Sequence, residues 1–434
     1  MDVGLLAGII MVTSVVIMLA IGMPISISIG ASSAMALGVI LPPASAFTTS
    51  AQKIFTGIDS FALLAIPFFV LAGNIMNNGG IAIRLVNIAK LVSGRLPGSV
   101  AQTNIVGNMM FGAISGSGNA AAAAIGGTMA PIMEQEGYGK DYIAAVNIAS
   151  APTGQIIPPS NTLIVFSTVA GGVSVAALFM AGYLPGILWG MSVMIVAGFI
   201  AKKRNYQSNY HVTAKEAVKI ILDGIPSLLL IIIIIGGILK GIFTATEGSA
   251  IAVVYALILS LCYRSLKVKD LYGILLESCK TTSIILMMIA MSSIMSWVMA
   301  YTRIPTFIAA SLLSVTDNKY IILLLMNILL LLVGTFMDPT PALLIFTPIF
   351  LPVCQSFGMN VVHFGVMIVF NLCFGGITPP VGTILFTGCR VAKVKIEEVI
   401  KTMLPFFVAI VVVLMLVTYV PQITLLIPSL FGLV

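Results

Sequence analysis

The sequence predicts an all-α polytopic membrane protein with inverted-topology repeats and two re-entrant helical hairpins. Three observations lead to this fold class: the composition, the placement of the basic residues, and an internal repeat whose copies run in opposite directions. Only 8% of the 434 residues are charged, whereas 59% are hydrophobic. A soluble domain has about 25% charged residues, and a disordered chain has far fewer apolar ones. A membrane protein is the class that remains.

The apolar residues form long runs, which predict helices rather than a β-barrel. The stretch Ser227–Ile235 is apolar at every position after its first, whereas the strands of a barrel alternate apolar and polar residues. At about 20 residues per crossing, the length allows about ten to twelve membrane elements. The run Leu5–Leu41, broken at Gly22-Met-Pro24, predicts the first two. We expect residues 1–434 to form a single integral unit in the lipid bilayer.

Lysine and arginine concentrate in four segments, which the positive-inside rule places in the cytoplasm. Two apolar runs, Ile225–Phe243 and Ser249–Tyr263, separate the second segment from the third and return the chain to the same side. The net charge of +7 therefore reflects orientation. Nucleic acid is not an expected partner, because no basic stripe with interleaved aromatic residues is present. The four segments are Arg84–Arg95, Lys202–Lys219, Arg264–Lys269 and Arg390–Lys401.

Two distant segments share the pattern Gly-x-Ile-x-Pro-Pro-x-x-Thr. They are Gly154–Thr162 and Gly375–Thr383, and their offset of 221 positions also relates Pro131 to Pro352 (352 − 131). The apolar run before residue 201 ends at a basic segment, whereas its counterpart after residue 403 begins at one. Copies of opposite direction indicate an inverted repeat, which is typical of secondary transporters. We expect repeat 1 at about 50–200, connecting scaffold helices at about 201–270, and repeat 2 at about 271–425.

Each repeat contains a break that predicts a re-entrant hairpin. In Gly112–Gly127 the centre, Ser115-Gly-Ser-Gly-Asn119, interrupts a helix and predicts a hairpin at about 101–133. The alternative is a packed helix pair with Gly112-x-x-x-Gly116 as its contact face. The corresponding segment Gly334–Pro341 predicts a second hairpin at about 320–357. There Asp338, followed by a proline, is expected to cap a helix, which leaves a ligand role open.

The two Pro-Pro segments predict cation sites. Prolines remove backbone donors and leave carbonyl oxygens free, and oxygen atoms are the ligands of hard cations. Ser150–Asn161 could instead be a surface loop, but apolar runs flank it on both sides. Because broken helices within a membrane are tolerated only where they line a cavity, we expect one cation site per repeat. Half-helix N-termini would face an anionic solute at the midplane.

Other functions have weaker signals. His363 is the only candidate base for an intramembrane hydrolase, and we expect it to be packed or interfacial. Gly137–Asp141 lacks the spacing of a P-loop, so a nucleotide-driven pump is not expected. The five cysteines include no C-x-x-C pair and read as small hydrophobes. Gly182-x-x-x-Gly186-x-x-x-Gly190 predicts helix packing. We expect a transporter with no enzyme activity and no organic cofactor; an ion channel and an intramembrane enzyme are the alternatives.

The motifs resemble those of a known family. Gly112–Gly127, Ile157-Pro-Pro-Ser160 and Gly334-Thr-Phe-Met-Asp-Pro339 are similar to the large membrane subunit of TRAP (tripartite ATP-independent periplasmic) transporters, over nearly the whole chain. The resemblance implies an elevator-type transporter of the bacterial inner membrane, in the ion transporter superfamily, that takes up an anionic solute with sodium ions. It also implies two partners: a periplasmic substrate-binding protein and a small four-helix membrane subunit, which we expect as a separate chain.

The resemblance also implies site residues, position by position. The offset of 221 maps Gly154 onto Gly375 and Ile157 onto Thr378, which pairs the two sodium sites. The first sodium site would use Ser115, Asn119, Gly154, Ile157 and Pro159, and the second Gly334, Gly375, Thr378 and Val381. Substrate contacts would fall on Ser115, Ser160 and Asp338.

The residues around the first Pro-Pro motif bear on the substrate. Members of the family for C4-dicarboxylates usually have an apolar residue after Ile-Pro-Pro-Ser, whereas Asn161 stands here. The segment Asn147–Gly154 is more similar to the sialic-acid members. Extra amide and hydroxyl groups suit a polyhydroxylated acid. We therefore favour sialic acid, with C4-dicarboxylates and other sugar acids as alternatives.

Overall fold

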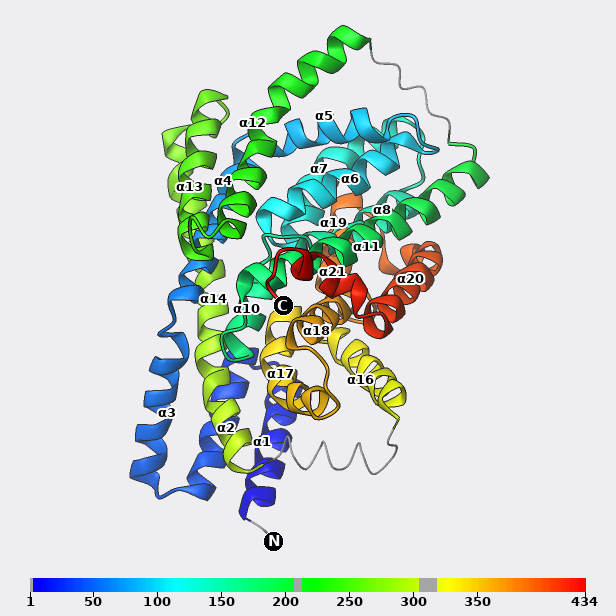
Figure 1. The fold of residues 1–434 in the computed structure, drawn as a ribbon. Helices are drawn as coiled ribbons and strands as arrows, with labels where there is room; N and C mark the ends of the chain where they lie inside the picture. The colour runs from blue at the N-terminus through cyan, green and yellow to red at the C-terminus, as the bar shows by residue number, and fades with distance from the viewer. Residues whose placement is uncertain (1–2, 207–212, 304–317) are drawn as a thin grey trace.

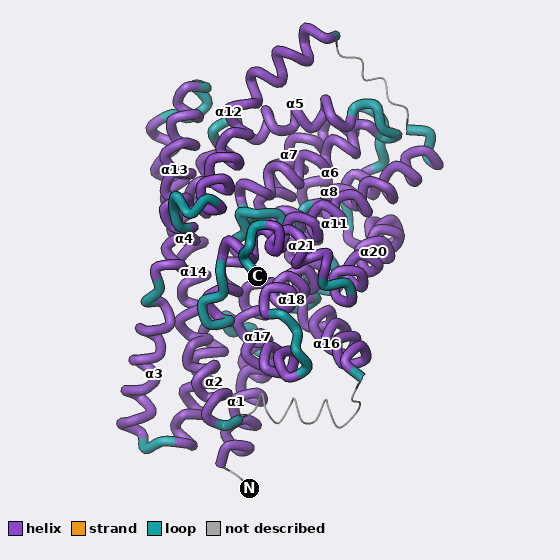
Figure 2. Tube along the Cα trace, viewed as in Figure 1, coloured by secondary structure: helices purple, strands orange, loops and turns teal. Residues whose placement is uncertain are grey.

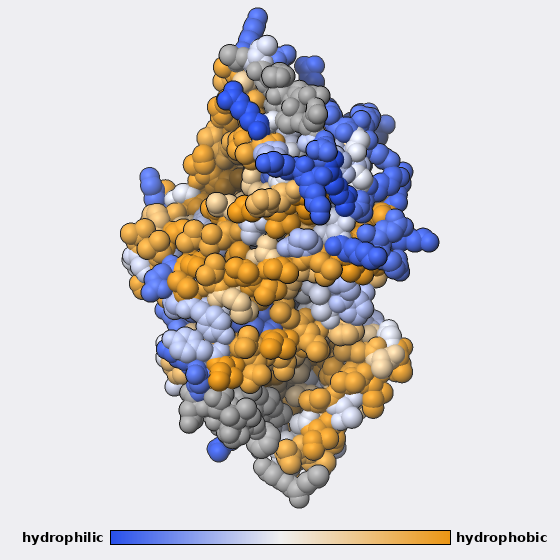
Figure 3. All heavy atoms as spheres, turned by 90° about the vertical axis from the view of Figure 1, so that its right-hand side faces the viewer, coloured by the Kyte–Doolittle hydropathy of each residue, from blue (hydrophilic) through white to orange (hydrophobic). Residues whose placement is uncertain are grey.

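A computed structural model describes residues 3–206, 213–303 and 318–434 (Figures 1 and 2). In these ranges every regular element is a helix, as the composition predicts. Eight of the described helices are long and apolar enough to cross a membrane. Figure 3 shows a broad hydrophobic band on one face, with hydrophilic residues concentrated towards its upper end. Helices suit lipid because their backbone groups are hydrogen-bonded within the segment.

One side of the molecule is an elongated layer, on the left in Figure 1. Its long helix α14 packs against α2, α3 and α4, and α13 lies along α4. The first two helices match the two crossings expected from Leu5–Leu41, and α12 and α13 match the pair expected between basic segments. The elements are α1 (Val3–Ala20), α2 (Ile25–Ile40), α3 (Pro43–Ile58), η1 (Phe61–Leu64), α4 (Ala65–Asn78), α12 (Ala214–Leu239), α13 (Ala245–Cys262) and α14 (Val268–Tyr301).

A second group of helices, on the right in Figure 1, contains the breaks predicted within the two repeats. The helix α5 (Ile81–Ser93) leads into it from α4. Repeat 2 as predicted, 271–425, includes 304–317, which lie outside the described residues. The elements are α6 (Ser99–Ser115), α7 (Gly118–Gln135), α8 (Lys140–Ser150), α9 (Thr153–Ile156), α10 (Asn161–Val169), α11 (Val175–Lys203), α16 (Lys319–Gly334), α17 (Pro339–Ser356), α18 (Val361–Gly375), α19 (Thr383–Ala392), α20 (Ile396–Tyr419) and α21 (Gln422–Leu430).

The two sets of broken helices share a close backbone crossing. A Cβ atom built on Gly154 would lie 2.3 Å from the Cα of Gly112, and one built on Gly375 would lie 2.4 Å from the Cα of Gly334. Such distances exclude any residue with a side chain unless the backbone shifts. The peptide bonds Pro158-Pro159 and Pro379-Pro380 are both cis. The equivalent motifs of the sequence therefore occupy equivalent places in the fold.

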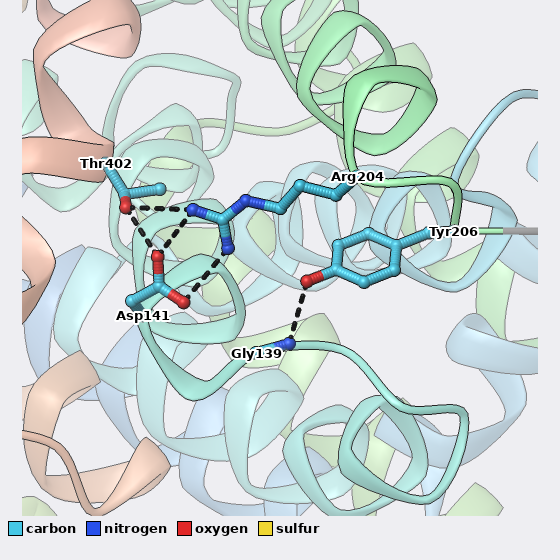
Figure 4. Close-up of polar contacts among 5 residues, drawn as sticks. All are labelled: Gly139, Asp141, Arg204, Tyr206 and Thr402. Carbon is cyan, nitrogen blue, oxygen red and sulfur yellow. Dashed lines mark hydrogen bonds and ion pairs between the residues drawn. The ribbon is translucent and has the colours of Figure 1, made fainter.

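A polar cluster shows how the two repeats are oriented (Figure 4). Arg204, directly after α11, donates to both carboxylate oxygens of Asp141 at 3.0 and 2.7 Å. Thr402, near the start of α20, donates to the same carboxylate at 2.6 Å. The end of α11 thus meets the beginning of α20, and the two helices pack together. They run in opposite directions, as the basic segments at these helix ends predict.

Candidate functional site

The breaks place helix N-termini close together in the middle of the second group. Ser117 caps α7 by accepting from the backbone N–H of Ala120 at 3.3 Å, and Ser160 caps α10 by accepting from Leu163 at 3.3 Å. Asp338 and Gly382 stand at the N-cap positions of α17 and α19. The N-terminus of a helix carries a partial positive charge and free N–H groups. Such an arrangement favours an anion.

A cavity of about 1000 Å³ lies beside these breaks, between the broken helices and the long helices α4 and α14. The broken helices contribute mostly polar groups, and α14 contributes charged residues at one end and apolar ones further along. The polar residues that line the cavity are Asn74, Asn77, Asn78, Ser115, Ser117, Asn119, Gln155, Asn161, Thr162, Lys269, Asp270, Glu277, Thr281, Asp338, Thr340 and Thr387.

A chain of hydrogen bonds connects the two repeats at the cavity. Thr383 donates to the carboxylate of Asp338 at 3.1 Å, and the amide of Asn119 donates to the Thr383 hydroxyl at 3.3 Å. Thr387 donates to the amide oxygen of Asn119 at 3.1 Å. Asp338 occupies the predicted N-cap position but makes no capping hydrogen bond with its side chain. Its carboxylate is instead held where the first hairpin meets α19.

The predicted residues of the first sodium site lie near one another at the first hairpin tip. Gly116 has a φ of +61°, and a Cβ atom there would lie 3.1 Å from the carbonyl oxygen of Pro159. Gly112 packs on Gly154 in the same crossing. Ser115 and Asn119 line the cavity on either side of the tip. The side chain of Ile157 points instead towards Gly186 of α11. Hydroxyl and carbonyl oxygens suit a hard cation.

The second set of predicted residues surrounds the equivalent break. Gly334 packs on Gly375, and the backbone N–H of Val381 donates to the carbonyl of Thr335 at 3.2 Å. A Cβ atom on Gly382 would lie 2.7 Å from the carbonyl oxygen of Gly376 and 2.9 Å from that of Thr378. Only glycine fits at this position without a shift of the backbone. These two carbonyl oxygens already accept backbone hydrogen bonds, that of Gly376 from Ile384 and that of Thr378 from Gly382.

The structure separates the three predicted substrate residues. Ser115 and Asp338 line the cavity. Ser160 is fully buried and donates to the carbonyl of Gln155 while it caps α10. It is not among the residues that line the cavity. Its hydroxyl therefore has a local structural role in the conformation described here.

Two amide side chains next to the Pro-Pro motif line the cavity: Asn161, which the sequence analysis used for the choice of substrate, and Gln155, which it did not single out. The amide oxygen of each is buried without a hydrogen-bond partner among the described residues. Their sequence signal was modest: polar amides on either side of the Pro-Pro motif. Lys269, Asp270 and Glu277 of α14 carried no signal, because only the packing of α14 brings them to the cavity.

The structure also shows the surroundings of the other candidates. His363 is 3% exposed, and its ring nitrogens lie 2.7 Å from the Thr424 hydroxyl and 3.2 Å from the Thr418 carbonyl. It is packed, as expected. Gly182 and Gly186 lie against Ile156 and Ile157, so the glycine stripe does serve helix packing. In the described ranges, no group of three His, Cys, Asp or Glu side chains is arranged to hold a metal.

Comparison with known proteins settles the family. A family model described as the DctM component of tripartite ATP-independent periplasmic transporters matches residues 12–423. The chain belongs to this family. It is therefore a TRAP large membrane subunit and a multi-pass protein of the bacterial inner membrane, as the resemblance implied. Members of this family are transporters that work with a small membrane subunit and a periplasmic binding protein.

Similar proteins carry different substrate names. The chain is 37% identical to the sialic acid TRAP transporter large permease SiaM of Vibrio cholerae, over 94% of this chain and 96% of that protein. It is 39% identical to the isethionate TRAP permease DctMQ of Oleidesulfovibrio alaskensis, over 93% of this chain and 64% of that protein. It is 53% identical to the uncharacterized YgiK of Salmonella typhimurium, over 96% of each chain.

A solved structure supports the fold. The YdaH transporter of Alcanivorax borkumensis aligns with a TM-score of 0.61, over 86% of this chain and 87% of that chain. Only 15% of the aligned residues are identical, so this likeness concerns the fold alone.

Proposed function

We propose that this TRAP large subunit carries out sodium-coupled uptake of an organic anion, with sialic acid favoured, by an elevator mechanism. A periplasmic binding protein delivers the solute, and a separate small membrane subunit completes the transporter. One observation carries the proposal: broken helices from both repeats meet at a cavity of about 1000 Å³ opposite α4 and α14.

The helix termini support an anionic solute. The first turns of α7, α10 and α17 contribute lining residues to the cavity. Their N–H groups and partial positive charge favour a carboxylate without a dedicated arginine. Lys269 adds one formal positive charge at the end of the cavity that adjoins the basic segment Arg264–Lys269.

The unpaired amide oxygens support a polyhydroxylated solute. Gln155 and Asn161 line the cavity, and their buried amide oxygens lack a partner, so a small turn of either side chain would present an acceptor to a donor on the solute. Sialic acid carries hydroxyl groups and an amide N–H, whereas a C4-dicarboxylate such as succinate carries only acceptors when ionised. A buried acceptor without a partner costs about 1–3 kcal/mol. C4-dicarboxylates, other sugar acids and isethionate, a substrate named for one relative, are the alternatives.

Charge balance and backbone geometry support the coupling to sodium. Asp270, Glu277 and Asp338 line the cavity together with Lys269, so acidic side chains exceed basic ones there. An anion entering this environment is stabilised by accompanying cations. The carbonyl-rich loops at the two Pro-Pro motifs, one from each repeat, would hold those cations.

The position of the cavity supports an elevator movement. It lies between the broken helices and a wall formed by α4 and α14, which is the interface along which one body would slide against the other. The cavity reaches the start of α14 and the end of α4, next to basic segments predicted to be cytoplasmic. We infer that this conformation faces the cytoplasm.

Uptake by proteoliposomes tests the proposal. The chain would be reconstituted with its small subunit and binding protein, and uptake of labelled sialic acid, succinate and isethionate compared under sodium and potassium gradients. We expect saturable sialic acid uptake that requires the sodium gradient. Uptake indifferent to the cation gradient would contradict the coupling, preference for another solute would reassign the substrate, and flux without saturation would indicate a channel.

A further inference from the structure

A groove of about 410 Å³ lies between α11 and the segment that joins α5 to α6. It shares no lining residue with the candidate transport cavity. Leu96 and Pro97 form one wall. The other wall carries Met191, Ile195 and Phe199, one helical turn apart on α11 and 50%, 58% and 71% exposed. Because α11 is a membrane-crossing candidate, this exposed apolar stripe is suited to contact with lipid.

The floor of the groove contains an unsatisfied polar atom. Gln102 lines the groove, is 2% exposed, and donates from Nε2 to the carbonyl oxygens of Met194 at 2.9 Å and Pro97 at 3.3 Å. These two acceptors determine which way the amide points. Its Oε1 is left buried without a partner among the described residues. This oxygen has almost no accessible surface, so the amide closes the floor of the groove and does not open into it.

A cationic side chain stands at one end of the groove. Lys202 lines the groove one helical turn beyond Gly198. A Cβ atom built on Gly198 would contact only the Gln102 amide, at 3.3 Å. Arg204, two residues later, is engaged with Asp141 at 2.7 Å. This end of α11 belongs to a predicted cytoplasmic basic segment. The ammonium of Lys202 therefore lies at the depth where lipid phosphates of the inner leaflet are found.

We propose that this groove binds a phospholipid of the cytoplasmic leaflet whose headgroup carries a net negative charge, as in phosphatidylglycerol. An acyl chain lies along Met191, Ile195 and Phe199, and the phosphate pairs with Lys202. A phosphatidylcholine headgroup has no net negative charge to pair with Lys202.

Native mass spectrometry of the purified full chain tests the lipid site. The protein in detergent would be titrated with phosphatidylglycerol and, separately, with phosphatidylcholine. We expect tighter binding of phosphatidylglycerol and a loss of about fivefold in its affinity for Lys202→Gln, the effect of one basic side chain on an anionic lipid. Lys203→Gln is the matched control, because Lys203 is adjacent in sequence but does not line the groove.

A second variant tests the apolar part of the site. Ile195→Trp fills the groove from an exposed position and should lower binding of phosphatidylglycerol while the melting temperature stays within a few degrees of the wild type. Equal phosphatidylglycerol affinity in wild type, Lys202→Gln and Ile195→Trp would overturn the proposal. So would phosphatidylcholine binding as tight as that of phosphatidylglycerol, or an equal loss in Lys202→Gln and Lys203→Gln.

Discussion

Each repeat contains one broken-helix unit, which consists of a glycine crossing and the Pro-Pro motif that follows it. The two units have the same backbone conformation at these places but different side chains. In the first unit, Ser160 and Asn161 follow the Pro-Pro motif, so a side chain caps the next helix and an amide faces the cavity. In the second unit, the equivalent positions are Val381 and Gly382, and no side chain caps the helix. The second unit instead contributes a carboxylate, Asp338. An inverted repeat can therefore contain two similar backbone loops and still present an asymmetric set of side chains to the cavity.

We expect the largest effects from substitutions at the glycine crossings, which test whether the two units are equally tightly packed. A Cβ atom on Gly112 would lie 2.2 Å from the Cα of Gly154, whereas one on Gly334 would lie 3.0 Å from the Cα of Gly375. We expect Gly112→Ala to destabilise the protein by about 1–3 kcal/mol and Gly334→Ala to cost less. Thermal unfolding in detergent measures both.

Gly127→Ala is the control for this pair, because a Cβ atom there meets nothing within 4 Å. Its melting temperature should equal or exceed that of the wild type, since alanine is the better helix former. Equal losses for the two crossing variants would show that the crossings tolerate a methyl group equally well.

Asp338 tests the carboxylate that only the second unit supplies. Asp338→Asn keeps an oxygen that can accept from Thr383 but removes the negative charge. We expect the sodium-dependent uptake rate to fall at least about tenfold, because hydrogen bonds and contacts to a charged group are worth about 1.5–3 kcal/mol. The variant should fold, as judged by its melting temperature. Unchanged uptake kinetics would remove Asp338 from the site.

The amides test the asymmetry on the side of the first unit. Gln155→Leu and Asn161→Val remove acceptors that have no partner in the described structure. Sialic acid uptake should fall by about fivefold for each, since one neutral hydrogen bond is worth about 1 kcal/mol. The melting temperature should not fall, because no hydrogen bond within the protein is lost. A solute without donors, such as succinate, should show no such loss, and an equal loss for both solutes would argue against recognition of hydroxyl groups.

The cluster where α11 meets α20 should show the smallest effect. Burial on its own raises the pKa of Asp141, but hydrogen bonds from Arg204 and Thr402 outweigh burial and lower its pKa below the usual value of 3.8. A lowered pKa in the folded state stabilises the protein above the pKa of the unfolded state, and this stability is lost as the pH falls. Arg204→Gln should therefore lower the melting temperature slightly at pH 7, because partly exposed ion pairs are worth about 0–1 kcal/mol.

The pH series provides the control for that variant. The difference in melting temperature between wild type and Arg204→Gln should begin to shrink as the pH falls through 3.8, the usual pKa of aspartate, and should go on shrinking until Asp141 is protonated in the folded state as well. A difference that stays constant over this range would assign the effect to lost packing of the arginine on its neighbours.

Much of this architecture was predictable because a segment in the bilayer must be apolar and must hydrogen-bond its own backbone groups. The break at Ser115-Gly-Ser-Gly-Asn119 lies where α6 ends and α7 begins, and Pro339 does begin α17. The role of Ser160 was harder to foresee. A serine before a helix can cap it or face a ligand, and the choice depends on the neighbouring Gln155 carbonyl, to which Ser160 donates.

The sequence by itself determined the class of protein, the places where helices break and the pairing of the two repeats. The class of protein follows from the composition. The helix breaks and the repeat follow from prolines and glycines, which change the backbone conformation only within a few residues of themselves. Only the tertiary structure decided that Asp338 meets Thr383, that the buried amide oxygens of Gln155 and Asn161 have no partner, and that α4 and α14 complete the wall of the cavity. Such contacts join segments far apart in the chain, and the packing of whole helices sets them.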